Sequence, residues 1–175
     1  SLFTVLVLIP LIFFTAYQSS PQFQKRVDTA ANEIIDYGNV LDGSVGQRIT
    51  FAVNSWDVIK KNPIIGVGTG DFPSEYKKIN QINTPQLPNT TNPHNMYTLI
   101  TMQLGLIGLV SMLSIFYYQI KLSFYASNKF IKDLGIALPL MFLVIMWSDS
   151  YLLGHYTTLV FIFFSSFLYK DFDKP

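Results

Sequence analysis

The feature that most constrains this chain is a long stretch without a charged side chain, residues 95–120. Half of the residues are hydrophobic, and the apolar ones are bunched rather than periodic. A membrane-spanning helix needs roughly 20 mostly apolar residues. Four apolar runs occur, at residues 2–17, 96–120, 134–148 and 150–169. The second and fourth runs are long enough, the first is cut off by the start of the chain, and the third is short. The sequence therefore predicts an all-α membrane protein with about four transmembrane helices.

The start of the chain bears on whether it is a whole protein. Ser1 stands where a complete protein would have Met, and the first apolar run follows directly. A cleaved signal peptide would carry basic residues at its front, and residues 1–4 have none. We therefore expect a fragment of a larger multi-pass protein.

The orientation of the spans follows from the lysines and arginines of the short loops, which favour the cytoplasm. Residues 121–133 carry three lysines against one acid, so we predict that this loop is cytoplasmic. The remaining segments then alternate. The predicted layout is a transmembrane helix at 1–17, an extracytoplasmic (periplasmic) loop with short helices at 18–95, transmembrane helices at 96–120, 134–148 and 156–169, an extracytoplasmic turn at 149–155, and a cytoplasmic tail at 170–175.

Composition excludes several classes of function. The chain has no cysteine, which removes disulfides, thiolate catalysis and cysteine metal sites. The net charge is +1. The predicted outer segment balances seven basic against seven acidic residues, so it is not a polybasic patch for nucleic acid.

Three short helices are expected in the outer segment. The first covers residues 25–37 and stops at Gly38. The second begins at a capping box of Ser44 and Gln47 and ends before Asn62-Pro63. The third covers residues 73–82. The apolar stripe predicted for the second helix is Val45, Ile49, Ala52, Trp56 and Ile59, with Arg48 close beside it.

Gly66, Gly68 and Gly70 form a glycine-rich stretch between the second and third helices. Such a stretch can cradle a phosphate with its backbone amides or make a tight turn that packs closely. The Gly-Lys-Ser/Thr ending of a nucleotide-binding loop is missing. We therefore favour a structural turn. For Gly105 and Gly108, in the 96–120 span, we expect close helix packing.

His94 lies where the polar segment meets the uncharged run. We expect Asn92 to cap the second span, Pro93 to take its first position, and His94 to lie in its first turn. The partial positive charge of a helix start disfavours imidazolium. The sequence thus predicts a neutral His94 that can accept a proton, and the alternative is a histidine that merely caps a span at the membrane interface.

With these pieces in order, residues 43 to about 113 resemble the superfamily of O-antigen ligases and polymerases. In the ligases a histidine and a glycine separated by ten residues recur, and His94 with Gly105 fits that spacing. Another recurring motif is an arginine with a leucine four residues later, where this chain has Arg48 and Ala52. The matching pieces are residues 43–48, Trp56, residues 62–72, residues 93–97 and residues 105–108.

The resemblance implies a metal-independent membrane glycosyltransferase without a cofactor, in the bacterial inner membrane. It would transfer a glycan from a polyprenyl diphosphate carrier to a hydroxyl of a glycan, lipid or protein acceptor at the periplasmic face. His94 would be the general base and Arg48 would bind the diphosphate. Asn95 and Tyr97 would contact substrate. A polymerase of the same superfamily is the alternative.

Other residues are weaker candidates. Asp149 and His155 are predicted on the same face as Arg48 and His94, so these two, with Trp56, could line the site. Asp171 and Asp173 have the spacing of a metal-binding pair, but we interpret them as a solvated tail. No His-x-x-x-His pair suggests a metal. Two alternatives belong to other classes of function. One is a part of a transporter or flippase, in which charged or broken spans are expected, and the other is a non-enzymatic membrane anchor.

Overall fold

A computed structural model describes residues 2–39 and 43–169. This part of the chain holds seven helices and no strand, which confirms the all-α prediction for it. The chain divides into two compact units, Ser1–Thr50 and Phe51–Pro175, and each is described by itself. The predicted tail at 170–175, with Asp171 and Asp173, lies outside the described residues.

The first unit contains α1 (Leu2–Ser19), α2 (Pro21–Ile35) and the start of α3 (Ser44–Ile59). α2 begins four residues before the predicted helix because Ser20 caps it, accepting a hydrogen bond from the amide of Phe23 at 3.3 Å, and Pro21 takes its first turn. The Tyr17 hydroxyl donates to Asp28 at 2.6 Å and joins α1 to α2.

Glu33 of α2 holds the start of α3. Its carboxylate is buried and accepts hydrogen bonds from the amides of Val45 and Gly46 at 2.7 and 3.0 Å. These amides belong to the first turn of α3, whose donors have no partner within the helix, and a negative charge is favourable there. The carboxylate of a neighbouring helix thus accepts hydrogen bonds from the first turn of α3. A local capping box of Ser44 and Gln47 was predicted at this helix start.

In the second unit the remainder of α3 packs against α4 (Phe72–Asn83). The predicted apolar stripe of α3 is partly wrong, since Ala52 is exposed and Trp56 is 57% exposed. The side that faces the core instead includes two polar residues, Asn54 and Ser55. A periodicity search that counts only apolar residues misses such a face. The buried residues of α3 in this unit are Phe51, Asn54, Ser55, Val58 and Ile59.

Side-chain amides join α3 to α4. Asn54 donates to the hydroxyl of Thr84 at 2.9 Å, and Asn83 donates to Asp57 at 2.9 Å. Lys60, 2.8 Å from the carboxylate, and then Asn83 lower the pKa of Asp57. A depressed pKa in the folded state means that this contact stabilises the fold above the ordinary aspartate range, and that its contribution is lost as the pH falls through the lowered pKa.

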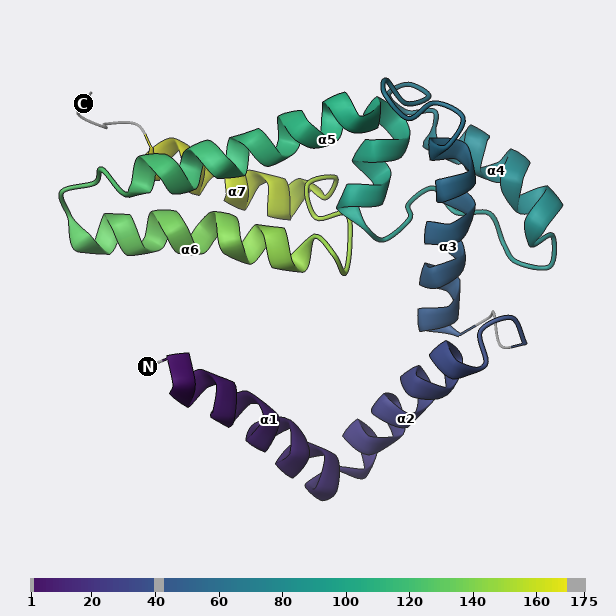
Figure 1. Ribbon diagram of the computed structural model, residues 1–175, viewed down its shortest axis with the longest axis horizontal. Coiled ribbons are helices and arrows are strands. Elements are labelled where there is room, and N and C mark those ends of the chain that lie inside the picture. Colours follow the sequence, from purple (N-terminus) through teal and green to yellow (C-terminus); the bar gives the residue numbers. More distant parts are fainter. Residues whose placement is uncertain (1, 40–42, 170–175) are drawn as a thin grey trace. The chain divides into compact units, whose positions relative to one another are not determined.

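The last three helices, α5 (Met96–Ser123), α6 (Lys129–Ile145) and α7 (His155–Leu168), lie side by side (Figure 1). Phe161 of α7 joins them, with its ring centroid 5.5 Å from Phe116 of α5 and 4.8 Å from Phe142 of α6. Gln119 of α5 also donates to the hydroxyl of Ser165 at 3.0 Å. Aromatic packing and polar contacts such as this one therefore hold the bundle together.

The helices coincide with the four predicted spans, but their ends differ. α6 begins at Lys129 rather than at residue 134 because Asn128 caps it, accepting from the amide of Phe130 at 2.8 Å. The predicted loop at 121–133 is therefore largely helical. Within the described residues, α5 alone is long and apolar enough to cross a membrane, and the apolar helices Leu6–Ser19 and His155–Leu168 are shorter. The four-span topology stays a prediction.

α5 is broken at Gly105, whose φ of 63° and ψ of −161° are not helical. The two parts of α5 run in different directions in Figure 1. A break frees backbone groups that need new partners. Residues 63–68 supply them: Val67 and Gly68 donate to the carbonyls of Met102 and Gln103 at 3.0 and 2.9 Å. In return, the amides of Leu106 and Ile107 donate to the carbonyls of Pro63 and Ile64 at 2.9 and 3.2 Å.

Glycine is required both in the loop of residues 63–68 and at the break in α5, where the two segments contact each other. A Cβ on Gly66 would lie 2.4 Å from the carbonyl of Gln103, and a Cβ on Gly105 would lie 2.2 Å from the carbonyl oxygen of Ile64. Both residues also have positive φ. The close packing predicted for Gly105 is therefore against a loop rather than against another helix.

Candidate functional site

His94 lies outside α5. The helix starts at Met96 and is capped by Asn95, whose side chain accepts from the amide of Thr98 at 2.9 Å. The prediction that Asn92 caps this helix and that His94 lies in its first turn is therefore wrong. His94 has φ of 52°, and no other non-glycine residue in the described ranges has a positive φ. His94 therefore does not occupy the first-turn position from which a neutral imidazole was predicted.

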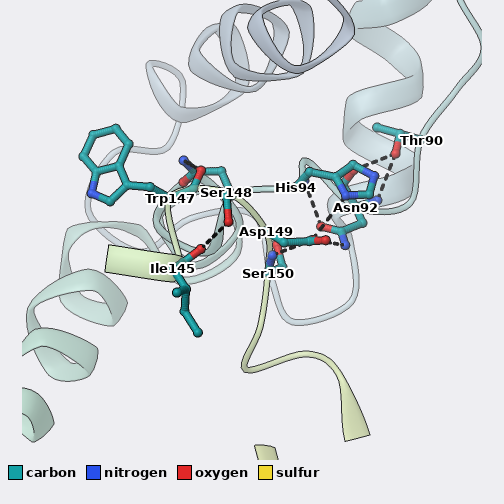
Figure 2. A network of polar contacts seen from close by, with 9 residues as sticks. Thr90, Asn92, His94, Ile145, Trp147, Ser148, Asp149 and Ser150 are labelled. Carbon is teal, nitrogen blue, oxygen red and sulfur yellow. Dashed lines mark hydrogen bonds and ion pairs between the residues drawn. The ribbon is translucent and has the colours of Figure 1, made fainter. Parts of the chain in front are cut away.

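Asp149 lies beside His94. Nδ1 of His94 is 3.2 Å from Oδ1 of Asp149, although 55 positions separate the two residues in the sequence (Figure 2). Asp149 belongs to the connection between α6 and α7. An ionised carboxylate only accepts hydrogen bonds, so this contact requires the proton on Nδ1 and leaves Nε2 of a neutral imidazole as the acceptor. The pair has the arrangement of a base oriented by a carboxylate.

Asn92 connects the two. Its side-chain oxygen accepts from the amide of His94 at 2.9 Å, and its side-chain nitrogen donates to Asp149 at 3.4 Å. Thr90 in turn accepts from the amide of Asn92 at 3.1 Å (Figure 2). The turn formed by Asn92 holds His94 in its positive-φ conformation. Sequence reasoning identified Asn92 only as a helix cap, and the Asn-Pro-His order is the signal that could have indicated a turn.

The surroundings of His94 leave one side open. The ring of Phe51 is stacked on the imidazole, with centroids 6.1 Å apart and an interplanar angle of 27°. The side chains of His94 and Asp149 are 40% and 37% exposed. The imidazole is therefore fixed from one face and still accessible to a substrate.

Asn95 and Tyr97 bind the end of α6. The side chain of Asn95 donates to the carbonyl of Trp147 at 3.2 Å, and the hydroxyl of Tyr97 donates to the carbonyl of Leu143 at 2.5 Å. The amide of Met96 donates to the carbonyl of Met146 at 3.0 Å. These bonds satisfy carbonyls that a helix end leaves without partners. They also bring Asp149, three residues after Met146, close to the start of α5.

The remaining predicted site residues belong to several different elements of the chain. Arg48 belongs to the first unit, is exposed, and forms no hydrogen bond or ion pair with any described residue. Trp56 is exposed on α3, and His155 is exposed at the start of α7. Gly68 and Gly70 have positive φ in the turn before α4.

Two open hollows occur in the second unit, and one of them is lined by Asp149. A groove of 610 Å³ runs along α5 from Met96 to Ile115, with Ile65 and Leu152 at its sides, and almost all of its lining is apolar. A second hollow of 420 Å³ is more polar and is lined by Asn92, Asp149, Ser150 and His155, among others. No group of three histidine or acidic side chains able to hold a metal occurs among the described residues.

These features define a helical protein whose described part holds one helix of membrane-spanning length, with a histidine–aspartate pair just before the start of that helix. The chain belongs to the O-antigen ligase family, whose sequence profile matches residues 1–113. Proteins of this family are membrane proteins. The matched range contains Arg48, His94 and Gly105, whereas Asp149 lies beyond it. None of the curated proteins matches the chain.

Proposed function

We propose that the protein transfers a glycan from a polyprenyl diphosphate carrier to an acceptor hydroxyl at the periplasmic face of the inner membrane, with His94 as the general base. The observation that carries this proposal is the 3.2 Å contact between His94 and Asp149. A sugar hydroxyl is a weak nucleophile until a base removes its proton. Nε2 of His94 takes that proton, and Asp149 stabilises the imidazolium that results.

In this step the acceptor oxygen forms a bond to the anomeric carbon of the glycan, and the bond from that carbon to the carrier diphosphate breaks. The electron pair leaves on the diphosphate, whose growing negative charge needs a cation or preorganised donors. We assign this task to Arg48, because its guanidinium offers a planar fork of donors to phosphate oxygens. The proposed reaction uses no metal.

The apolar groove along α5 supports a lipid-linked donor. It begins at Met96, two residues after His94. A polyprenyl chain is a wholly apolar ligand, and an apolar groove accepts it by van der Waals packing without burying an unpaired polar group. A lipid in this groove would bring its diphosphate end close to the histidine.

The experiment that tests this function uses vesicles that contain the purified full-length protein, lipid-linked glycan extracted from a strain lacking the gene, and the glycan-free surface lipids of that strain. We expect glycan-bearing surface lipid and free polyprenyl diphosphate to form together. A polymerase would instead lengthen the lipid-linked glycan. A transporter part would move the glycan without breaking a bond, and a membrane anchor would do neither.

The break in α5 is the observation that favours the transporter alternative. However, the freed backbone groups around Gly105 bond to residues 63–68. In addition, residues 96–120 of the helix carry no charge that could bind a transported ion. We therefore place the transferase first.

Substitution of Asp149 by asparagine should lower the rate of transfer by roughly 10²-fold or more, because the amide no longer enforces the tautomer with the proton on Nδ1. The rate is measured in the vesicle assay. If Asp149 acts through His94, adding Asp149→Asn to a His94→Asn variant causes little further loss. Additive losses would show that Asp149 has a separate, structural role.

Substitution of Arg48 by alanine should lower kcat by about 10²-fold if its guanidinium stabilises the leaving diphosphate. Arg48→Lys should restore only part of the rate, since an ammonium cannot bind two phosphate oxygens as a planar fork. Arg26 is the other arginine of the chain and is exposed on α2, so Arg26→Ala is the matched control. Equal rates for Arg48→Ala and Arg26→Ala would remove Arg48 from the site.

A further inference from the structure

A buried hydroxyl group that the fold does not use belongs to Ser150, one of the residues that line the second hollow. This residue is 3% exposed. Its amide donates to Asp149 at 2.7 Å, whereas its side-chain oxygen has no hydrogen-bond partner among the described residues. A buried hydroxyl without a partner is destabilising. A role toward a ligand is one explanation of such a group, and the position of Ser150 next to Asp149 favours that explanation.

The rest of the lining has the chemistry of a sugar-binding site. Asn92, Asp149 and Thr157 offer polar groups, while Tyr151 and Tyr156 add aromatic rings. Sugars present hydroxyl groups at their edges and C–H groups on their faces, so they suit a lining that combines hydrogen-bonding groups with amphipathic aromatic rings. The volume of 420 Å³ falls within the range of small-ligand sites, about 300–1,000 Å³.

We infer that this hollow binds the sugar ring that carries the attacking hydroxyl, with Ser150 as a binding residue. The inference rests on the proposed function and adds the place of the acceptor to it. Asn92 and Asp149 belong both to the lining and to the hydrogen bonds around His94. A sugar in the hollow would therefore lie beside the base that takes its proton. The apolar groove on α5 remains for the lipid of the donor.

Saturation-transfer NMR on the full-length protein in detergent tests this binding directly, with the methyl glycosides of glucose, galactose and N-acetylglucosamine as probes. We expect at least one glycoside to bind. Ser150→Ala should weaken this binding by about three- to tenfold, the value of one hydrogen bond. Ser148→Ala is the matched control, because Ser148 is exposed and donates to the carbonyl of Ile145 (Figure 2).

Thermal unfolding distinguishes a binding residue from a structural one. Loss of an unpartnered hydroxyl should leave the midpoint of Ser150→Ala unchanged or raise it. Tyr156 is exposed on α7, so Tyr156→Leu removes an aromatic ring of the lining without disturbing the core, and it should also weaken binding. If neither variant weakens the binding of any glycoside, or if no glycoside binds the unmodified protein, the inference is wrong.

Two further measurements separate this inference from the proposed function. A His94→Asn variant should still bind the glycosides although it no longer transfers glycan. Binding without any transfer by the unmodified protein would contradict the proposed function and leave the sugar site in place. In the vesicle assay, Ser150→Ala should raise the KM for the glycan-free surface lipids and not that for the lipid-linked glycan. The reverse result would place the donor sugar in the hollow and overturn the assignment to the acceptor.

Discussion

Replacement of His94 by asparagine should lower the rate of glycan transfer by about 10²- to 10⁴-fold, the usual contribution of a general base. Asparagine is the appropriate substitute because His94 has φ of 52°. Asparagine and aspartate adopt a positive φ more readily than most other residues that have a side chain. An alanine variant would add backbone strain to the loss of the base. The rate is measured in vesicles at equal amounts of folded protein.

If His94 has only a structural role before α5, a different outcome is expected. In a His94→Gly variant the backbone conformation costs nothing, and the space beside Phe51 is open. Added imidazole should then restore part of the rate in proportion to its concentration. Full activity of His94→Asn, or a loss that imidazole does not reverse in His94→Gly, would contradict the role of His94 as a base.

The helices of the described residues could largely be predicted from the sequence, because α1, α5, α6 and α7 come from apolar runs and the other three helices are marked by end signals or an apolar stripe. Their ends could not. α6 starts five residues before its apolar run, because Asn128 caps it and the charged residues Lys129, Lys132 and Asp133 fill its first turns. A search for apolar residues ignores such turns. The same limitation concealed Asn54 and Ser55 on the buried face of α3 and led to the wrong prediction for Trp56.

Part of the candidate site was also predictable. His94 is indicated by its place before an uncharged run, and the predicted topology places Asp149 on the same side of the membrane as His94. The contact between them was not predictable, because it depends on hydrogen bonds that join the end of α6 to Asn95, Met96 and Tyr97. Asn92 and Asn95 both can cap a helix, and only the structure shows that Asn95 does so.

The largest expected effect on stability belongs to Gly105. Its φ of 63° and ψ of −161° lie in a region open essentially to glycine alone. A Cβ at this position would also lie 2.2 Å from the carbonyl oxygen of Ile64, which is backbone and cannot rotate away. Gly105→Ala should therefore separate residues 63–68 from α5 and destabilise the protein by roughly 3 kcal/mol or more, from backbone strain and lost hydrogen bonds together.

Gly70 is the matched control for this change. It too has positive φ, 86°, but nothing lies within 4 Å of the position of its Cβ. Gly70→Ala thus introduces the backbone strain alone, which costs roughly 1–2 kcal/mol. Thermal unfolding of the full-length protein in detergent should show a much lower midpoint for Gly105→Ala than for Gly70→Ala. Equal midpoints would mean that the loop does not hold the broken helix together, and that α5 keeps its form through its own packing against α6 and α7.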